Sequence, residues 1–334
     1  MDVRKLVLLM VAGMAVITSV AAGATELTVY SARKEHLIKP VFDAYTSETG
    51  VRIRYLTDKA PSLLQRLKAE GKRSPADILI TVDAGNLWHA AREGVLQSVR
   101  SPLLEENVPA HLRDPEGYWY GLSIRARTIV YNTNRVKPEE LSTYGALAGP
   151  AWKDRLVLRT SKKVYNQSLV AMLIAEKGYD ETKRIVSGWV ANLAAAPFSN
   201  DTKVLEAVAA GVGEVGIVNT YYYGRLMREK PDLPLALFWP DQQGSGVHVN
   251  VSGAGVAAHA PNRDEAVRFL EWLSSPAAQK IFADANMEYP VNQAVQPHPT
   301  VASWGTFKQN MINLANAGAR QAEAVRLMDE AGYR

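Results

Sequence analysis

The chain has 334 residues and a formal net charge of +4, and its lysines and arginines are scattered along the sequence. Without a basic block, the sequence gives no sign of a nucleic-acid partner. There is no cysteine, which excludes disulfides, zinc–thiolate sites and iron–sulfur clusters, so any bound metal must be held by oxygen or imidazole. A chain of this length exceeds what one hydrophobic core usually serves, which predicts two lobes.

Residues 1–24 have the pattern of a secretory signal peptide. Arg4 and Lys5 form a basic start, an apolar run covers residues 6–20, and Ala-Gly-Ala at 22–24 supplies small residues for cleavage. The apolar run is too short to span a bilayer comfortably, and no later stretch approaches that length. We therefore expect a protein exported to the periplasm, with a mature chain that begins near Thr25 and no stable membrane insertion.

The first part of the mature chain alternates strands and helices. Alternating or continuous apolar residues predict strands, and apolar residues at helical spacing predict helices. The expected order is strand 26–30, a helix through 37–45 closed by Gly50, strand 51–55, helix 62–70 and strand 77–81. This order predicts the α/β class, with mostly parallel sheets and flanking helices.

Two long segments, 118–132 and 246–257, are expected to cross between lobes. A second α/β series lies between them, with strand 155–158, helix 167–177, a helix capped by Asn200 and strand 214–218. Helices follow at 263–273, at 277–285 and from 315. We expect a two-lobed periplasmic-binding-protein fold with its ligand cleft between the lobes. The predicted N-terminal lobe is 25–125 plus about 252–300, and the C-terminal lobe is about 126–251 plus about 301–334.

Three consecutive tyrosines, Tyr221 to Tyr223, directly follow the strand that ends at Val218. On a strand, neighbouring side chains point to opposite faces and could not share one small target. At the start of a helix they lie about 100° apart, close enough to converge. Helix-forming residues follow the tyrosines, and Asn219 or Thr220 is suited to cap such a helix.

Converging phenols suit a hard, highly charged cation. A phenol is neutral at physiological pH, and a trivalent ion beside the oxygen stabilises the phenolate. Fe³⁺ is the biological ion for which phenolate is a favoured ligand, whereas calcium and magnesium prefer several carboxylates. Tyrosines also serve as packing residues or as a platform for stacking sugars, so the run by itself leaves both alternatives open.

Short motifs in a specific order and spacing resemble the periplasmic ferric-ion-binding proteins of iron ABC importers over the whole mature length. They are Val29–Arg33, Ser74–Asp77, Thr81–Gly85, Gly121–Arg127, Val164–Ser168, Asn219–Tyr222 and Glu288–Asn292. The resemblance implies a non-enzymatic, monomeric carrier that binds Fe³⁺ through tyrosinates and delivers it to an inner-membrane ABC permease.

The resemblance also implies the iron ligands. The paired tyrosines match Tyr221 and Tyr222, and a third ligand of one large branch matches Tyr165, which we expect on a loop before the helix at Gln167. Many relatives have histidine in the first lobe where this chain has Lys34 and Glu35. Glu35 is either a carboxylate ligand or a solvated glutamate in the first turn of a helix.

Three tyrosinates fill only three of the six coordination positions that Fe³⁺ prefers. The resemblance implies that water or a synergistic anion such as carbonate fills the others. Arg33, Arg125 and Arg127 are candidates to hold that anion, because guanidinium offers a fixed fork of donors, and we favour Arg33 and Arg125. Each is alternatively an arginine of the cleft rim or of a salt bridge.

The same fold also binds small organic ligands such as thiamine, polyamines, phosphonates and sugars, and fold alone does not decide function. A cationic organic ligand would require tryptophan faces, which Trp88, Trp119 and Trp239 could offer. Enzyme motifs are lacking: the sequence contains neither a nucleophile elbow nor a phosphate-binding loop. A visible tyrosinate absorption band would distinguish iron from an organic ligand.

Overall fold

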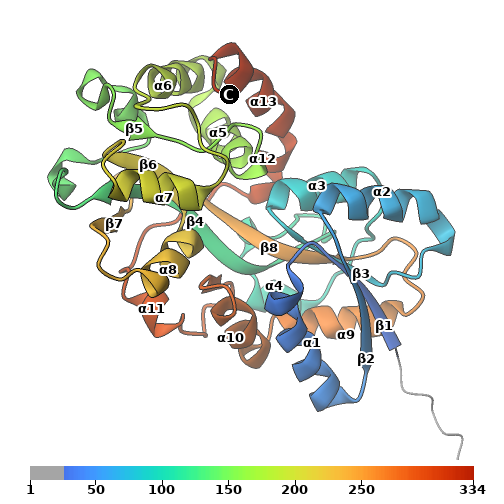
Figure 1. Ribbon diagram of the computed structural model, residues 1–334. Helices are drawn as coiled ribbons and strands as arrows, with labels where there is room; N and C mark the ends of the chain where they lie inside the picture. The colour runs from blue at the N-terminus through green and yellow to red at the C-terminus, as the bar shows by residue number, and fades with distance from the viewer. Residues whose placement is uncertain (1–25) are drawn as a thin grey trace, which may run out of the picture.

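The computed structural model describes residues 26–334, so the predicted signal peptide at 1–24 and the predicted start near Thr25 lie outside it. Two α/β lobes are joined by two long strands, β4 and β8 (Figure 1). The strands are β1 Glu26–Ser31, β2 Arg52–Thr57, β3 Ile78–Val82, β4 Tyr120–Asn132, β5 Leu156–Val157, β6 Val215–Asn219, β7 Leu235–Phe238, β8 Val249–Val256 and β9 Tyr289–Pro290.

The helices follow the strands on both sides of the sheet, and short 3₁₀ turns connect several of them. The α-helices are α1 Glu35–Thr49, α2 Ala60–Glu70, α3 Ala84–Arg92, α4 Pro102–Asn107, α5 Val164–Lys177, α6 Tyr179–Ala191, α7 Asp201–Ala209, α8 Thr220–Glu229, α9 Arg263–Leu273, α10 Pro276–Asp284, α11 Pro299–Ala302, α12 Leu314–Ala319 and α13 Gln321–Glu330. The predicted α/β class and two-lobed binding-protein fold are confirmed.

The strands follow the order β2-β1-β3-β8-β4-β6-β5, with β7 and β9 paired to β4. β1 is parallel to β2 and β3, and β5 is parallel to β6, as expected for α/β units. β4 and β8 are antiparallel to each other, β8 is antiparallel to β3, and β4 is antiparallel to β6. The sheet is therefore mixed rather than mostly parallel, because one crossing strand leaves the first lobe and the other returns to it.

Sequence periodicity accounts for helix α1. Its buried residues are Leu37, Ile38, Val41, Phe42 and Tyr45, the helical spacing seen in the sequence. The helix ends at Gly50, whose φ of 76° lies in the left-handed region and whose N–H donates to the carbonyl of Thr46. Glycine tolerates that conformation, so the helix ends where the sequence predicts.

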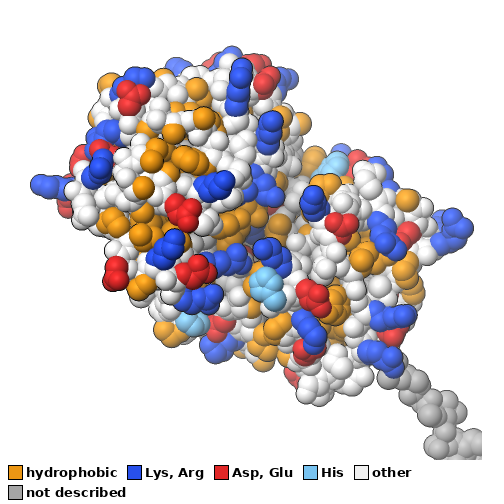
Figure 2. Space-filling model, in the orientation of Figure 1, with side chains coloured by type: hydrophobic (Ala, Val, Ile, Leu, Met, Phe, Trp, Pro, Cys, Tyr) orange, Lys and Arg blue, Asp and Glu red, His pale blue; other side chains and the backbone are white. Residues whose placement is uncertain are grey.

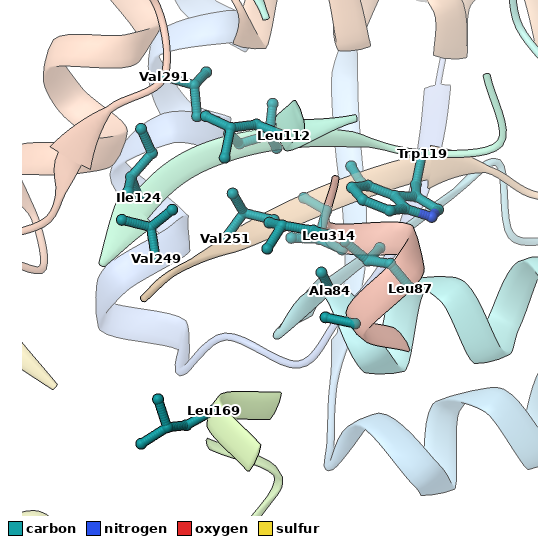
Figure 3. Packing of buried hydrophobic residues seen from close by; sticks show 14 of the residues in the cluster. Ala84, Leu87, Leu112, Trp119, Ile124, Leu169, Val249, Val251, Val291 and Leu314 are labelled. Carbon is teal, nitrogen blue, oxygen red and sulfur yellow. The ribbon is translucent and has the colours of Figure 1, made fainter. Parts of the chain in front are cut away.

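Helix α12 packs against both lobes. Leu314 lies beside Ala84 and Leu87 of α3 in the core around β4 and β8 (Figure 3). A Cβ at Gly318 would lie 2.6 Å from the Cβ of Trp88, so this approach requires glycine. The same helix also contacts α5, and α13 packs along α5. The end of the chain therefore connects α3 of the first lobe with α5 of the second lobe.

Among residues 26–334, no helix is both long and apolar enough to cross a membrane.

Candidate functional site

A cavity of about 440 Å³ opens between the two lobes. Loops and helix starts after β1, β2 and β3 line one side, and the starts of α5 and α8 line the other side. Figure 2 shows basic side chains along the hollow between the two halves of the molecule. The site thus lies where strands of an α/β sheet end and helices begin, the usual position of a ligand site.

The strand-to-helix junction places two tyrosines in this cavity. β6 ends at Asn219 and α8 begins at Thr220, so the predicted helix start is confirmed. Tyr221 and Tyr222 both line the cavity, and their ring centroids lie 4.4 Å apart. The hydroxyl of Tyr223 instead donates to the carbonyl of Leu235 at 3.3 Å, and its side chain is not part of the cavity lining.

Tyr165 lines the same cavity from the opposite helix. Helix α5 begins at Val164, so Tyr165 lies in its first turn and not on a preceding loop as the sequence led us to expect. Three cations surround its ring, with Arg125, Arg159 and Lys163 at 5.5, 5.2 and 5.4 Å from the centroid. These positive charges favour the phenolate over the phenol.

Burial sets the protonation of two of these tyrosines. It raises the pKa of Tyr165, although the charge of Arg125 opposes the shift. Burial raises the pKa of Tyr221 well above 10, and the adjacent Tyr165 and Tyr222 raise it further. Both phenols are therefore protonated at neutral pH, and a strongly charged cation at the oxygens would displace the protons.

The two favoured arginines occupy different positions. Arg33 lines the cavity and is 3% exposed, and its Nη1 lies 2.9 Å from Oε2 of Glu288. The Nε and Nη2 of Arg33 have no hydrogen-bond partner within residues 26–334. Arg125 is not part of the cavity lining. Its guanidinium lies 5.5 Å from the centroid of the Tyr165 ring, and its Nη2 lies 3.6 Å from Oδ2 of Asp83. The geometry therefore gives Arg33 the better access to an anion.

Glu35 lies outside the cavity lining, whereas its neighbour Lys34 is part of it. The Glu35 side chain is exposed in the first turn of α1, and its Oε1 accepts a hydrogen bond from the Tyr55 hydroxyl at 2.7 Å. This arrangement is that of a solvated first-turn glutamate. The structure thus brings Tyr165, Tyr221, Tyr222 and Arg33 together and leaves Glu35 apart.

Several cavity residues were not identified from the sequence. They are Lys59, Lys162, Lys163, Arg225 and Asn286. The pair Lys162-Lys163 lies just before Tyr165, so its position in the sequence was an available signal. Arg225 follows Tyr221 by four residues on α8, so helical spacing was also an available signal. Lys59 and Asn286 come from segments far away in the chain, and no sequence pattern connects them to the tyrosines.

Arg127, the third candidate arginine, is a structural residue. It is 1% exposed, and its Nη1 donates to Asp201 at 3.0 Å and to Asn219 at 3.1 Å, while its Nε donates to Asn166 at 2.9 Å. These partners belong to α7, to the end of β6 and to α5. The guanidinium therefore joins the segments that carry the tyrosines.

Replacing Arg127 by methionine is expected to lower the free energy of unfolding by about 3–5 kcal/mol, because it leaves the buried Asp201 with one cation fewer. Urea denaturation of the ion-free protein measures this loss. Arg155→Met is the control, since Arg155 pairs with Glu214 at 2.6 Å in a partly exposed position and its loss should cost only about 0–1 kcal/mol. Equal losses in the two variants would contradict the structural role.

Comparisons with known proteins identify chains that are similar to this one. Residues 73–309 match the family model described as bacterial extracellular solute-binding protein. Iron uptake protein A1 of Synechocystis sp. is 45% identical over 315 residues, which cover 92% of this chain and 88% of that protein. The major ferric iron-binding protein of Neisseria meningitidis serogroup B is 26% identical over 333 residues, covering 96% of this chain and 97% of the relative.

A solved structure from Trichodesmium, of FutA in complex with iron and citrate ligands, superposes with a TM-score of 0.90 at 43% identity and covers 92% of this chain and 100% of that one. Ferric iron-binding protein A of Mannheimia haemolytica, in an open conformation, gives a TM-score of 0.87 at 36% identity, covering 93% and 99%. The chain belongs to the bacterial extracellular solute-binding proteins, a family of non-enzymatic carriers, and within it to the ferric iron-binding periplasmic group.

Proposed function

We propose that this protein binds Fe³⁺ in the periplasm through the phenolate oxygens of Tyr165, Tyr221 and Tyr222 and delivers it to an inner-membrane ABC permease for iron uptake. The observation that carries this proposal is that all three tyrosines line one cavity between the lobes. They come from the first turns of α5 and α8, so their positions are fixed by two separate helices.

The donor set favours a trivalent ion over the common divalent ones. No aspartate or glutamate lines the cavity, and residues 26–334 contain no group of three or more His, Cys, Asp or Glu suited to a metal. Calcium and magnesium would require carboxylate oxygens, and zinc would require imidazole or thiolate. Phenolate remains, and an ion of high charge beside the oxygens favours its formation.

The charge of the cavity supports the addition of an anion. Its lining contains six cationic side chains: Arg33, Lys34, Lys59, Lys162, Lys163 and Arg225. Three phenolates would neutralise Fe³⁺ and leave this positive charge uncompensated. Carbonate or a carboxylate would offset it and complete the coordination, and the Trichodesmium relative holds iron together with citrate. The two donors of Arg33 without a protein partner are suited to such an anion.

The ion would bind first to the tyrosines of the C-terminal lobe, and the N-terminal lobe would then close over it. Lobes divided as the sequence predicts, at about residues 125 and 251, would rotate about β4 and β8. The hydroxyl of Ser168 on α5 donates to Oδ1 of Asp83, just before α3, at 2.6 Å. This hydrogen bond would hold the two sides of the cleft together. The closed complex would then dock on the permease.

A titration of the mature protein with ferric citrate tests the proposal. The expected result is a visible absorption band from tyrosinate bound to Fe³⁺, which saturates at one ion per chain. Mg²⁺ in place of iron should give no band. A protein that stays colourless would contradict the proposal and favour the alternative, a carrier of a small organic ligand.

A further inference from the structure

The turn between α10 and β9, at residues 285–288, holds two of the arginines in the cleft. Met287 has a φ of 53°, in the left-handed region that residues other than glycine rarely adopt. The N–H of Glu288 donates to the carbonyl of Ala283 at 3.0 Å, and Met287 is buried with its sulfur against Gly224 of α8. The turn is therefore fixed both to its own helix and to the helix that carries Tyr221 and Tyr222.

The residues on either side of Met287 each accept a hydrogen bond from an arginine. Oε2 of Glu288 accepts from Nη1 of Arg33 at 2.9 Å and from the hydroxyl of Ser123 at 2.7 Å. The side-chain oxygen of Asn286 accepts from Nη2 of Arg225, whose guanidinium lies 5.2 Å over the ring of Tyr221. One short turn thus connects an arginine of the first lobe with a tyrosine of the second lobe.

Contacts with Phe282, Glu288 and Ser123 determine the orientation of the Arg33 guanidinium. Its guanidinium lies 4.2 Å over the ring of Phe282 in α10, and Nη1 is engaged by Glu288 and Ser123. This leaves Nε and Nη2 without a partner in the described chain. Those two nitrogens form the edge of guanidinium that binds a carboxylate through two parallel hydrogen bonds. A buried donor without a partner destabilises the protein, and a bound anion that accepts its hydrogen bond would remove this cost.

Glu288 itself is buried, with its side chain 2% exposed. Burial opposes its ionisation, but the charges of Arg33 and Arg125, with the hydrogen bonds from Ser123 and Arg33, lower its pKa overall. An ionised glutamate here balances the guanidinium charge without entering the cavity, since Glu288 is not among its lining residues.

We infer that Glu288 is a positioning residue for anion binding. It holds one end of the Arg33 guanidinium so that the Nε–Nη2 edge faces the carboxylate of the anion bound together with the ion. This inference rests on the proposed function. It adds a residue that touches neither the ion nor the anion and that sets the affinity for the anion.

The test is the anion dependence of the visible band in Glu288→Gln. Gln keeps the size of the side chain and an acceptor oxygen but removes the charge. At fixed ferric ion, bicarbonate and citrate are titrated in separate experiments. E288Q should need about tenfold or more of at least one anion to reach half of the maximal band, the range typical of residues that orient ligands without binding metal.

Glu265→Gln is the matched control. Glu265 is also buried and accepts from the Tyr45 hydroxyl at 2.5 Å and from Arg268 at 3.0 Å, but it lies in α9 outside the cavity lining. E265Q should keep the anion requirement of the wild type even where it lowers the melting temperature. A loss of stability alone therefore does not account for the result expected of E288Q.

The outcomes distinguish a failure of the proposed iron binding from a failure of the role of Glu288. A wild-type protein that stays colourless with either anion overturns both. A coloured wild type, with E288Q at the wild-type anion requirement, overturns only the role of Glu288. If E288Q does not fold, Glu288→Asp decides, because it keeps the charge but withdraws it by one methylene. E288D should then show a raised anion requirement, and an unchanged requirement overturns the inference.

Discussion

Replacing Tyr222 by phenylalanine is expected to lower the affinity for Fe³⁺ by more than about 100-fold and to remove most of the visible band. Residues that only orient a metal ligand already contribute 10–100-fold, and Tyr222 would supply a ligand atom itself. The ring of Tyr222 is retained in Phe, so its packing against Tyr221, at 4.4 Å between centroids, should persist. Competition with a chelator of known affinity measures the loss.

The chain provides a closely matched control in Tyr223→Phe. Tyr223 is next in sequence and on the same helix, but its hydroxyl donates to a backbone carbonyl and does not line the cavity. This variant should bind Fe³⁺ as the wild type does, with the same absorption band. An unchanged affinity in Tyr222→Phe would remove Tyr222 from the ligand set.

Acidification is expected to weaken binding steeply. Burial raises the pKa of Tyr165 and that of Tyr221 above the ordinary value of a phenol, so both carry their protons before an ion binds. Binding to phenolates must release those protons, and a lower pH therefore opposes binding at every pH below these pKa values. Release of these two protons alone would reduce the affinity by about 10²-fold for each pH unit.

The proton count is measured with a pH indicator when iron is added to weakly buffered protein, after subtraction of the protons that the ferric salt releases alone. Arg125 and Arg159 near Tyr165 stay protonated in the neutral range and add no protons. At least two protons are expected for the wild type, one each from Tyr165 and Tyr221. An affinity that does not change between pH 8 and pH 6 would contradict phenolate binding.

Much of the fold was predictable because apolar periodicity is a local signal. The spacing of Leu37 to Tyr45 predicted α1, and Gly50 marked its end. The long apolar segments predicted the two crossing strands, observed as β4 and β8. Helix α3 was not predicted, since its nine residues are partly polar and it packs on α12 from the far end of the chain. The antiparallel direction of β8 beside β3 was also not predictable, because it depends on the point at which the chain re-enters the first lobe from the second.

The adjacency of Tyr221 and Tyr222 after a buried strand was enough to predict their shared direction, since a strand followed by a helix start restricts where two neighbouring side chains can point. Only the tertiary structure decided which distant residues join them. It excluded Glu35 from the cavity, left Arg125 behind Tyr165 and placed Arg33 at the cleft, held by Glu288 from 255 positions away. The sequence by itself therefore determined the class of protein and the shared direction of Tyr221 and Tyr222. The rest of the site depends on long-range packing between two lobes, for which a single sequence carries no local pattern.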